Sequence, residues 1–306
     1  KNEIKKFLGE QRDGIKYMHD QTLRLMSHGY VPTEIANKIE FPPALAKLWH
    51  LRGYYGALKH NVQGIYAYYL GWYDGNPANL DKLPPREMAN KTLAYMGGIN
   101  NVLKKAKIDF ENGEYRWVAS ILDQIIWSDP DNKEAKELAI LTYSQLGFSA
   151  ENATWRNAYL SAAQELKDGL PKRIKNHRTL RDVLKGMSPL LLLNSLSIRL
   201  NGPKAINKKF SINWKIKNSN EICHSELTNC VLVNRDGIDP RAKVNINISR
   251  DKLSEYALGQ IDIDEIIKDD IIIEGDKHIL KNLDQMLDNF PAWFPIARHN
   301  LKFEED

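Results

Sequence analysis

The sequence lacks the features that define several specialised classes of protein. Only two of its 306 residues are cysteines, which excludes a disulfide scaffold. Its longest leucine run, Leu190–Leu193, is far shorter than the roughly 18–20 apolar residues that cross a bilayer. With 43 basic and 39 acidic side chains, the net charge of +4 gives a nucleic-acid role little electrostatic support. We therefore expect a soluble globular protein with neither a membrane span nor a nucleic-acid partner.

Motifs that carry chemistry by themselves are also missing. None of the eight histidines has H-x-H or H-E-x-x-H spacing, so we expect no metal ligands in this chain. No G-x-S-x-G, P-loop or G-x-G-x-x-G sequence is present. The cysteines, Cys223 and Cys230, are expected to be reduced core thiols, although a hairpin would bring them closer together.

The densest aromatic stretch extends from Tyr54 to Pro77 and contains an adjacent His60 and Asn61. Glycines beside large rings favour a shaped surface where the backbone passes close to another chain segment or a ligand. His60 is the candidate general acid or base. A well-packed helical corner with a structural histidine would have the same composition, and the pattern alone leaves both interpretations open.

Residues 1–170 are predicted to be entirely helical. Apolar spacing of three and four predicts helices over residues 3–28, 31–36, 41–46 and 57–70, with Thr33 as a cap of the second. Apolar runs over 89–110, 115–126 and 135–146 then predict paired helices, closed by a helix over 151–166. Their turns resemble those of a tetratricopeptide-like hairpin.

Residues 171–306 are predicted to form an α+β domain, with an antiparallel sheet backed by helices. The predicted helices cover 180–187, 252–258, 262–268 and 277–288. Period-two patterns predict extended segments over 197–200, 210–216, 221–227, 230–233, 244–248 and 271–276.

Several runs carry a family resemblance that covers essentially the whole chain: His19–Leu25, Arg52–Gly56, His60–Asn61, Tyr69–Leu80, Trp155–Leu160, Leu200–Pro203 and Glu274–Asp276. They resemble the alkylsulfatases of the metallo-β-lactamase superfamily. The resemblance implies a helical dimerisation domain at 1–170, a sterol-carrier-protein-like domain at 171–306, and a homodimer.

The resemblance also implies hydrolysis of a linear primary alkyl sulfate, such as dodecyl sulfate, to alcohol and sulfate. The family holds two zinc ions in an N-terminal domain through a His-x-His-x-Asp-His motif, which nothing here matches. Because the sequence begins at Lys1 without a methionine, we expect it to start just downstream of that domain. The catalytic domain would then act in cis or in trans.

By the same resemblance, His60 and Tyr73 would reach the metal site from the second coordination sphere. The expected alkyl-chain or substrate contacts are Asn61, Leu193, Phe290, Trp293 and Phe294. The apolar members would equally serve as the core of a small domain. The competing interpretation is a stand-alone, non-enzymatic dimerising protein that binds lipid or a fatty alcohol. The compartment stays open between periplasmic, secreted and cytoplasmic.

Overall fold

The computed structural model describes residues 1–170, 186–268, 272–291 and 293–297. The chain divides into two compact units, one made of residues 1–171 and 294–306 and the other of residues 172–293. The C-terminal segment therefore belongs to the first unit, a return that the sequence pattern did not predict. The expected helix over 180–187 lies almost wholly outside the described residues.

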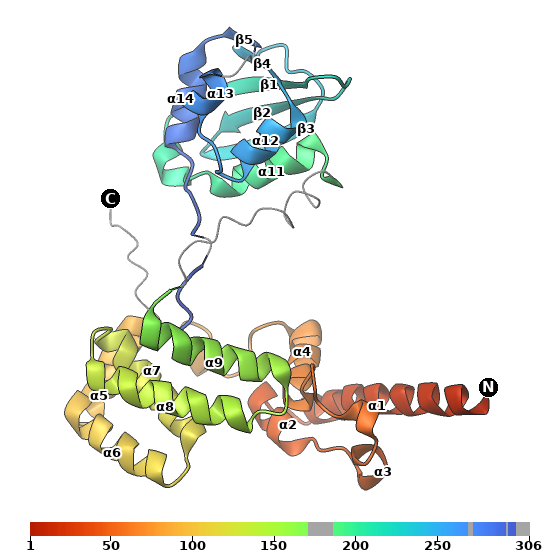
Figure 1. The fold of residues 1–306 in the computed structure, drawn as a ribbon, viewed down its shortest axis with the longest axis vertical. Coiled ribbons are helices and arrows are strands. Elements are labelled where there is room, and N and C mark those ends of the chain that lie inside the picture. The colour runs from red at the N-terminus through yellow and green to blue at the C-terminus, as the bar shows by residue number, and fades with distance from the viewer. Residues whose placement is uncertain (171–185, 269–271, 292, 298–306) are drawn as a thin grey trace. The chain divides into compact units, whose positions relative to one another are not determined.

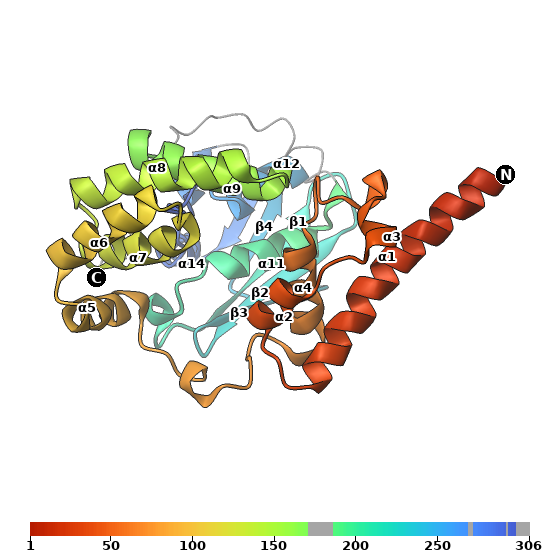
Figure 2. The same cartoon turned by 90° about the horizontal axis from the view of Figure 1, so that it is seen from below.

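The first unit is helical, as expected. Its helices α1 to α4 gather at one end and α5 to α9 at the other in both views (Figure 1 and Figure 2). The elements are α1 (Asn2–Ser27), α2 (Pro32–Lys38), α3 (Pro43–Ala46), η1 (Trp49–Leu51), α4 (Leu58–Leu70), η2 (Pro77–Asn79), α5 (Pro85–Tyr95), α6 (Ile99–Glu111), α7 (Tyr115–Ser128), α8 (Lys133–Ser149) and α9 (Ala153–Asp168).

Two helix ends differ from expectation for local reasons. Thr33 does not cap α2, because Val31 is the N-cap and its N–H donates to the Glu34 carboxylate at 3.1 Å. The apolar run over 89–110 forms two helices, α5 and α6. Gly97 and Gly98 separate them, both with φ of +87°, which favours glycine.

Two apolar clusters hold the first unit together. Leu25, Ile35, Val62 and Tyr66 pack where α1, α2 and α4 meet. The larger cluster is built mainly from α6 to α9, with Val118, Leu122, Ile125 and Ala139 almost fully buried. Except for α3, which buries no residue, the α-helices turn an apolar side into one of these clusters, so their other sides face solvent or a cleft.

The connection between α8 and α9 holds in place the loop over residues 52–57, called the aromatic loop below. Ala153 N donates to Tyr54 O at 2.8 Å, and Thr154 Oγ1 donates to Tyr55 O at 3.2 Å. Asn152 Nδ2 also donates to Tyr55 O, and Arg52 pairs with Glu151. Segments about 100 positions apart in sequence are thereby joined beside α4.

The second unit contains a five-stranded sheet in the order β3-β2-β1-β4-β5, accompanied by helices, so the expected helical plus α+β fold class is confirmed (Figure 1). One pairing, β1 with β4, is parallel and the other three are antiparallel, which makes the sheet mixed. The elements are α11 (Pro189–Arg199), η3 (Gly202–Ala205), β1 (Phe210–Ile216), β2 (Ile222–Thr228), β3 (Val231–Asp236), β4 (Val244–Ile248), α12 (Arg250–Ala257), α13 (Ile263–Lys268), β5 (Ile272–Gly275) and α14 (Lys277–Gln285).

The expectation of an extended segment at 197–200 is wrong. Residues 197–199 complete α11, which Ser188 caps by accepting the Leu191 N–H. The helix continues because Leu192, Leu193 and Leu196 are fully buried on one side of it. Packing of that stripe outweighs the short alternation in the sequence.

The two cysteines are free thiols, as expected, but only Cys223 is a buried core residue. Cys223 lies buried on β2, while Cys230 sits in the β2–β3 turn with φ of +63°. Burial, with the neighbouring Asp236, raises the pKa of Cys223 to about 12. Its thiol therefore stays protonated and unreactive at neutral pH.

A buried carboxylate ties the C-terminal segment to the first unit. Glu165 on α9 is 6% exposed and accepts hydrogen bonds from Ile296 N at 2.8 Å and Ala297 N at 2.9 Å. Ala297 is itself buried against the larger cluster. Charge-assisted hydrogen bonds of this kind are among the stronger ones in proteins.

Removing this carboxylate should release the segment. In Glu165→Ala the two N–H groups lose their acceptor, at a cost of about 1–3 kcal/mol. We expect amide hydrogen exchange at Ile296 and Ala297 to accelerate by about tenfold or more. The exposed Glu137→Ala on α8 is the control and should leave both rates unchanged. Equal exchange rates in wild type and Glu165→Ala would show that the carboxylate does not hold the segment.

Candidate functional site

A groove of about 380 Å³ runs between α1 and α4. Its wall on α4 extends from the helix face opposite the buried Val62 and Tyr66, which carries His60, Asn61 and Gly64, round to Tyr69. His19 contributes from α1. The lining residues are His19, His60, Asn61, Gly64, Ile65, Tyr68 and Tyr69.

The structure brings His60 and Asn61 together at this groove, where both are exposed. The ring centroid of His60 lies 6.4 Å from that of Trp155, edge to face, so α9 supports one side of the imidazole. Gly64 leaves the middle of the groove open, since a Cβ built there would meet nothing within 4 Å. An exposed imidazole beside an amide can exchange protons with a bound group.

A larger cleft of about 770 Å³ adjoins the groove and shares Asn61 with it. Its walls come from α1, the aromatic loop and the α8–α9 connection. At Gly53 a Cβ would lie 2.9 Å from Gly56 O, so this tight approach requires glycine. The expectation of a shaped surface around the aromatic stretch therefore has a structural counterpart.

A chain of hydrogen bonds crosses from α1 to the groove wall. His19 Nδ1 lies 3.0 Å from Asp20 Oδ1, and His19 Nε2 lies 2.8 Å from Tyr69 Oη. A hydrogen bond from Lys16 and a smaller effect of the hydrogen bond from His19 lower the pKa of the Asp20 carboxyl group. The sequence carried no signal that would join His19 to Tyr69, because no motif links residues 50 positions apart.

The remaining predicted site residues lie elsewhere. Tyr73 is half-buried, with its ring centroid 5.8 Å from that of Trp72, and it lines neither cleft. Leu193 is 0% exposed within the core of the second unit. Phe290, Trp293 and Phe294 are all more than half exposed. The predicted alkyl-chain contacts are thus one core residue and three surface aromatics.

The described residues contain no group of three or more His, Cys, Asp and Glu side chains arranged to hold a metal ion. Within the same residues, no helix is both long and apolar enough to span a membrane.

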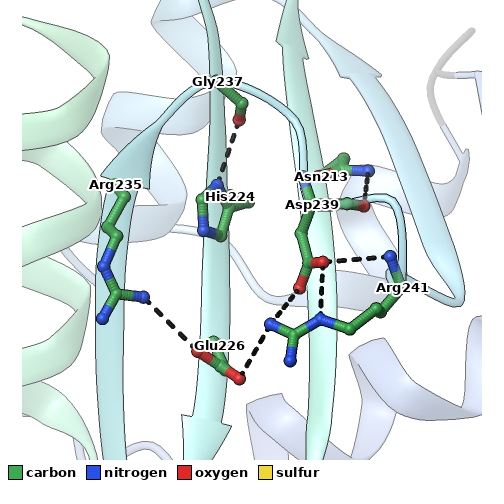
Figure 3. Close-up of polar contacts among 7 residues, drawn as sticks. All are labelled: Asn213, His224, Glu226, Arg235, Gly237, Asp239 and Arg241. Atoms are coloured by element: carbon green, nitrogen blue, oxygen red, sulfur yellow. Dashed lines mark hydrogen bonds and ion pairs between the residues drawn. The ribbon is translucent and has the colours of Figure 1, made fainter.

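A second polar cluster lies on the sheet of the other unit (Figure 3). Arg241 bridges two carboxylates, with Nε 3.0 Å from Asp239 Oδ1 and Nη2 3.2 Å from Glu226 Oε1. Arg235 Nη1 donates to the other oxygen of Glu226 at 3.3 Å. The Asn213 side chain donates to Asp239 O and accepts from Asp239 N. Each charged side chain in this cluster contacts one of opposite charge, so we interpret the cluster as structural.

Comparison with known proteins identifies the class to which this arrangement belongs. Residues 31–169 match the family described as alkyl sulfatase dimerisation, and residues 178–298 match that described as alkyl sulfatase C-terminal. The chain therefore belongs to the alkylsulfatases, and the family resemblance seen in its motifs is confirmed.

Its relatives include an alkyl/aryl-sulfatase of Saccharomyces cerevisiae, 40% identical over 96% of this chain and 45% of the relative. A linear primary-alkylsulfatase of a Pseudomonas species is 38% identical over 96% of this chain and 44% of the relative. The solved structure of a stereoselective inverting secondary alkylsulfatase from Pseudomonas is 33% identical, with a TM-score of 0.87 over 97% of this chain and 47% of that one. The chain thus spans somewhat less than half the length of these relatives.

The Asp239 carboxylate makes the stability of the second unit depend on pH. Hydrogen bonds from Arg241 hold its pKa well below the ordinary value. A depressed carboxylate pKa stabilises the fold above the unfolded-state pKa of about 4, and the contribution is lost as pH falls through the folded-state value. Asp239→Asn should therefore lower Tm at pH 7, and the difference from wild type should shrink toward pH 2–3.

Thermal unfolding of both proteins across this pH range checks the prediction. Asp251→Asn, on α12, is the control, and it should change Tm little at any pH. A Tm difference between wild type and Asp239→Asn that stays constant from pH 7 to pH 2 would contradict the assignment.

Proposed function

We propose that this chain supplies the dimerisation and C-terminal parts of an alkylsulfatase that hydrolyses linear primary alkyl sulfates to alcohol and sulfate. The observation that carries the proposal is the match to alkylsulfatases over 96–97% of the chain in both sequence and structure. The relatives named for their substrates include both primary and secondary alkylsulfatases. The choice of a primary substrate rests on the motif resemblance alone, because the 34% identity to the secondary enzyme lies between the 38% and 31% identities to two primary enzymes.

His60 would act on the departing alcohol. Cleavage of a sulfate ester leaves an alkoxide-like oxygen that must gain a proton, and an imidazolium within hydrogen-bond reach can donate one. The exposed position of His60 on the groove wall supports this role. Tyr73 would orient the sulfate or the histidine, a role that rests on the family resemblance alone.

The proposed enzyme needs a catalytic domain that holds the zinc ions. Family members place two zinc ions in a domain of the metallo-β-lactamase superfamily, which would join this chain in cis or in trans. When bound, the ions would supply an activated hydroxide. We further propose that two copies of the chain associate, because the first unit matches a dimerisation family.

The second unit would bind the alkyl chain as a sterol-carrier-protein-like module. Its exposed Phe290 and Trp293 are the described residues that support such contact. The same exposure favours a second candidate, a non-enzymatic dimerising protein that binds fatty alcohols. Gel filtration and a fatty-alcohol binding assay test the dimer and the ligand directly.

The two candidates separate when the chain is assayed together with the N-terminal catalytic part of a related alkylsulfatase. Release of sulfate from dodecyl sulfate supports the enzyme. Binding of dodecanol without any release of sulfate, under conditions in which the catalytic part is folded and loaded with zinc, supports the second candidate.

Within an active assembly, His60→Ala should lower kcat by about 100-fold or more, the usual size of a general acid's contribution. The exposed His28→Ala, at the C-terminal end of α1, is the matched control and should retain wild-type turnover. Unchanged turnover in His60→Ala would remove His60 from the proposed mechanism.

A further inference from the structure

Asp20, His19 and Tyr69 form a hydrogen-bonded series whose direction follows from the chemistry of the groups. Each oxygen of the Asp20 carboxylate has its own partner. Oδ2 accepts a hydrogen bond from Lys16 Nζ, and Oδ1 lies 3.0 Å from His19 Nδ1. An ionised carboxylate can only accept hydrogen bonds. His19 Nδ1 must therefore carry the hydrogen that is shared with Asp20.

The assignment of Nδ1 determines the role of Tyr69 when the His19 imidazole is neutral. In a neutral imidazole with hydrogen on Nδ1, the Nε2 atom is an acceptor. Tyr69 Oη, 2.8 Å from Nε2, must then donate its own hydrogen to His19. The lone pairs of Tyr69 Oη are left to accept a hydrogen bond from another group.

Tyr69 has room for such a group. It is 49% exposed, and it lines the same groove as His60 and Asn61. Tyr69 and His60 are nine positions apart on α4, which corresponds to about 13 Å along the helix axis. The groove between them is open at Gly64.

We propose that Asp20 and His19 are positioning residues that hold Tyr69 Oη as a hydrogen-bond acceptor for a hydroxyl-bearing ligand in the α1–α4 groove. The ligand class is a primary alcohol, whose O–H donates to Tyr69 while its chain lies along Ile65 and Tyr68. That this alcohol is the product of sulfate ester cleavage rests on the proposed function, whereas the binding site itself does not.

The first test uses this chain alone and needs no sulfatase activity. In a sample with ¹⁵N-labelled histidine, the His19 ring should show hydrogen on Nδ1 and an acceptor Nε2. Titration with n-hexanol should shift the Nε2 resonance. Methyl n-pentyl ether, which has the same size but no O–H, should leave the resonance in place.

Variants test whether the n-hexanol shift depends on the Tyr69 hydroxyl and on the open groove. Tyr69→Phe removes only the hydroxyl, so it should abolish the n-hexanol shift while keeping the chain folded. Tyr95→Phe, at a tyrosine on α5 that is 95% exposed, should respond as wild type does. Gly64→Leu should block the groove without an internal clash and weaken the response. Gly9→Leu, also open to solvent within a helix, is its control.

The proposal would be overturned by hydrogen on Nε2 of wild-type His19, by an equal shift with the ether, or by a persisting n-hexanol shift in Tyr69→Phe. A purely structural link between α1 and α4 would give the expected tautomer but no response to n-hexanol, which also overturns the proposal.

In the assembled sulfatase, Tyr69→Phe and His19→Gln should each raise the Kd of n-hexanol by roughly 3- to 10-fold, the size expected for one hydrogen bond. The double variant should cost little more than either single one, since both act through the same contact. If the assembly hydrolyses no alkyl sulfate at all, the proposed function fails, and the result of the n-hexanol titration still stands on its own.

Discussion

Burial of Val62 and Tyr66 is the constraint on which the candidate site depends. These two side chains pack with Leu25 and Ile35 and thereby determine how α4 is rotated about its axis. A helix turned in this way must present the opposite face to its surroundings. That face carries His60, Asn61 and Gly64, so an apolar contact on one side of the helix places these residues at the groove on the other.

Hydrogen bonds and a ring contact hold the segments next to that groove. The Tyr54–Tyr55 loop is held by main-chain and side-chain bonds from the α8–α9 connection, and Trp155 at the start of α9 supports the His60 ring. These contacts place His60 and Tyr69 on a packed helix, which holds their side chains at the groove.

The second unit relies on a different balance. Its sheet buries Trp214, Ile246 and the leucines of α11 on the side of the helices. Elsewhere on the sheet, matched charges around Arg241 satisfy a carboxylate that is almost completely buried. Glu165 then binds the chain where it returns to the first unit, so the second unit is connected to the first at both of its ends.

Periodicity in the sequence predicted most helices and strands because it reports which face of an element is apolar. It failed at residues 197–199, where the leucine stripe of α11 is buried by contacts that a short alternating pattern does not encode. It also missed the parallel pairing of β1 with β4, since pairing depends on where a strand is inserted into the sheet.

The sequence by itself determined the family and the order of the helical and mixed units. Only the tertiary structure decided that His19 meets Tyr69, that Glu165 meets Ile296, and that Leu193 is core whereas Phe290 is exposed. The physical reason is that helix and strand patterns are local. Hydrogen-bond partners from distant segments are chosen by how the apolar faces pack, and that packing is a property of the whole fold.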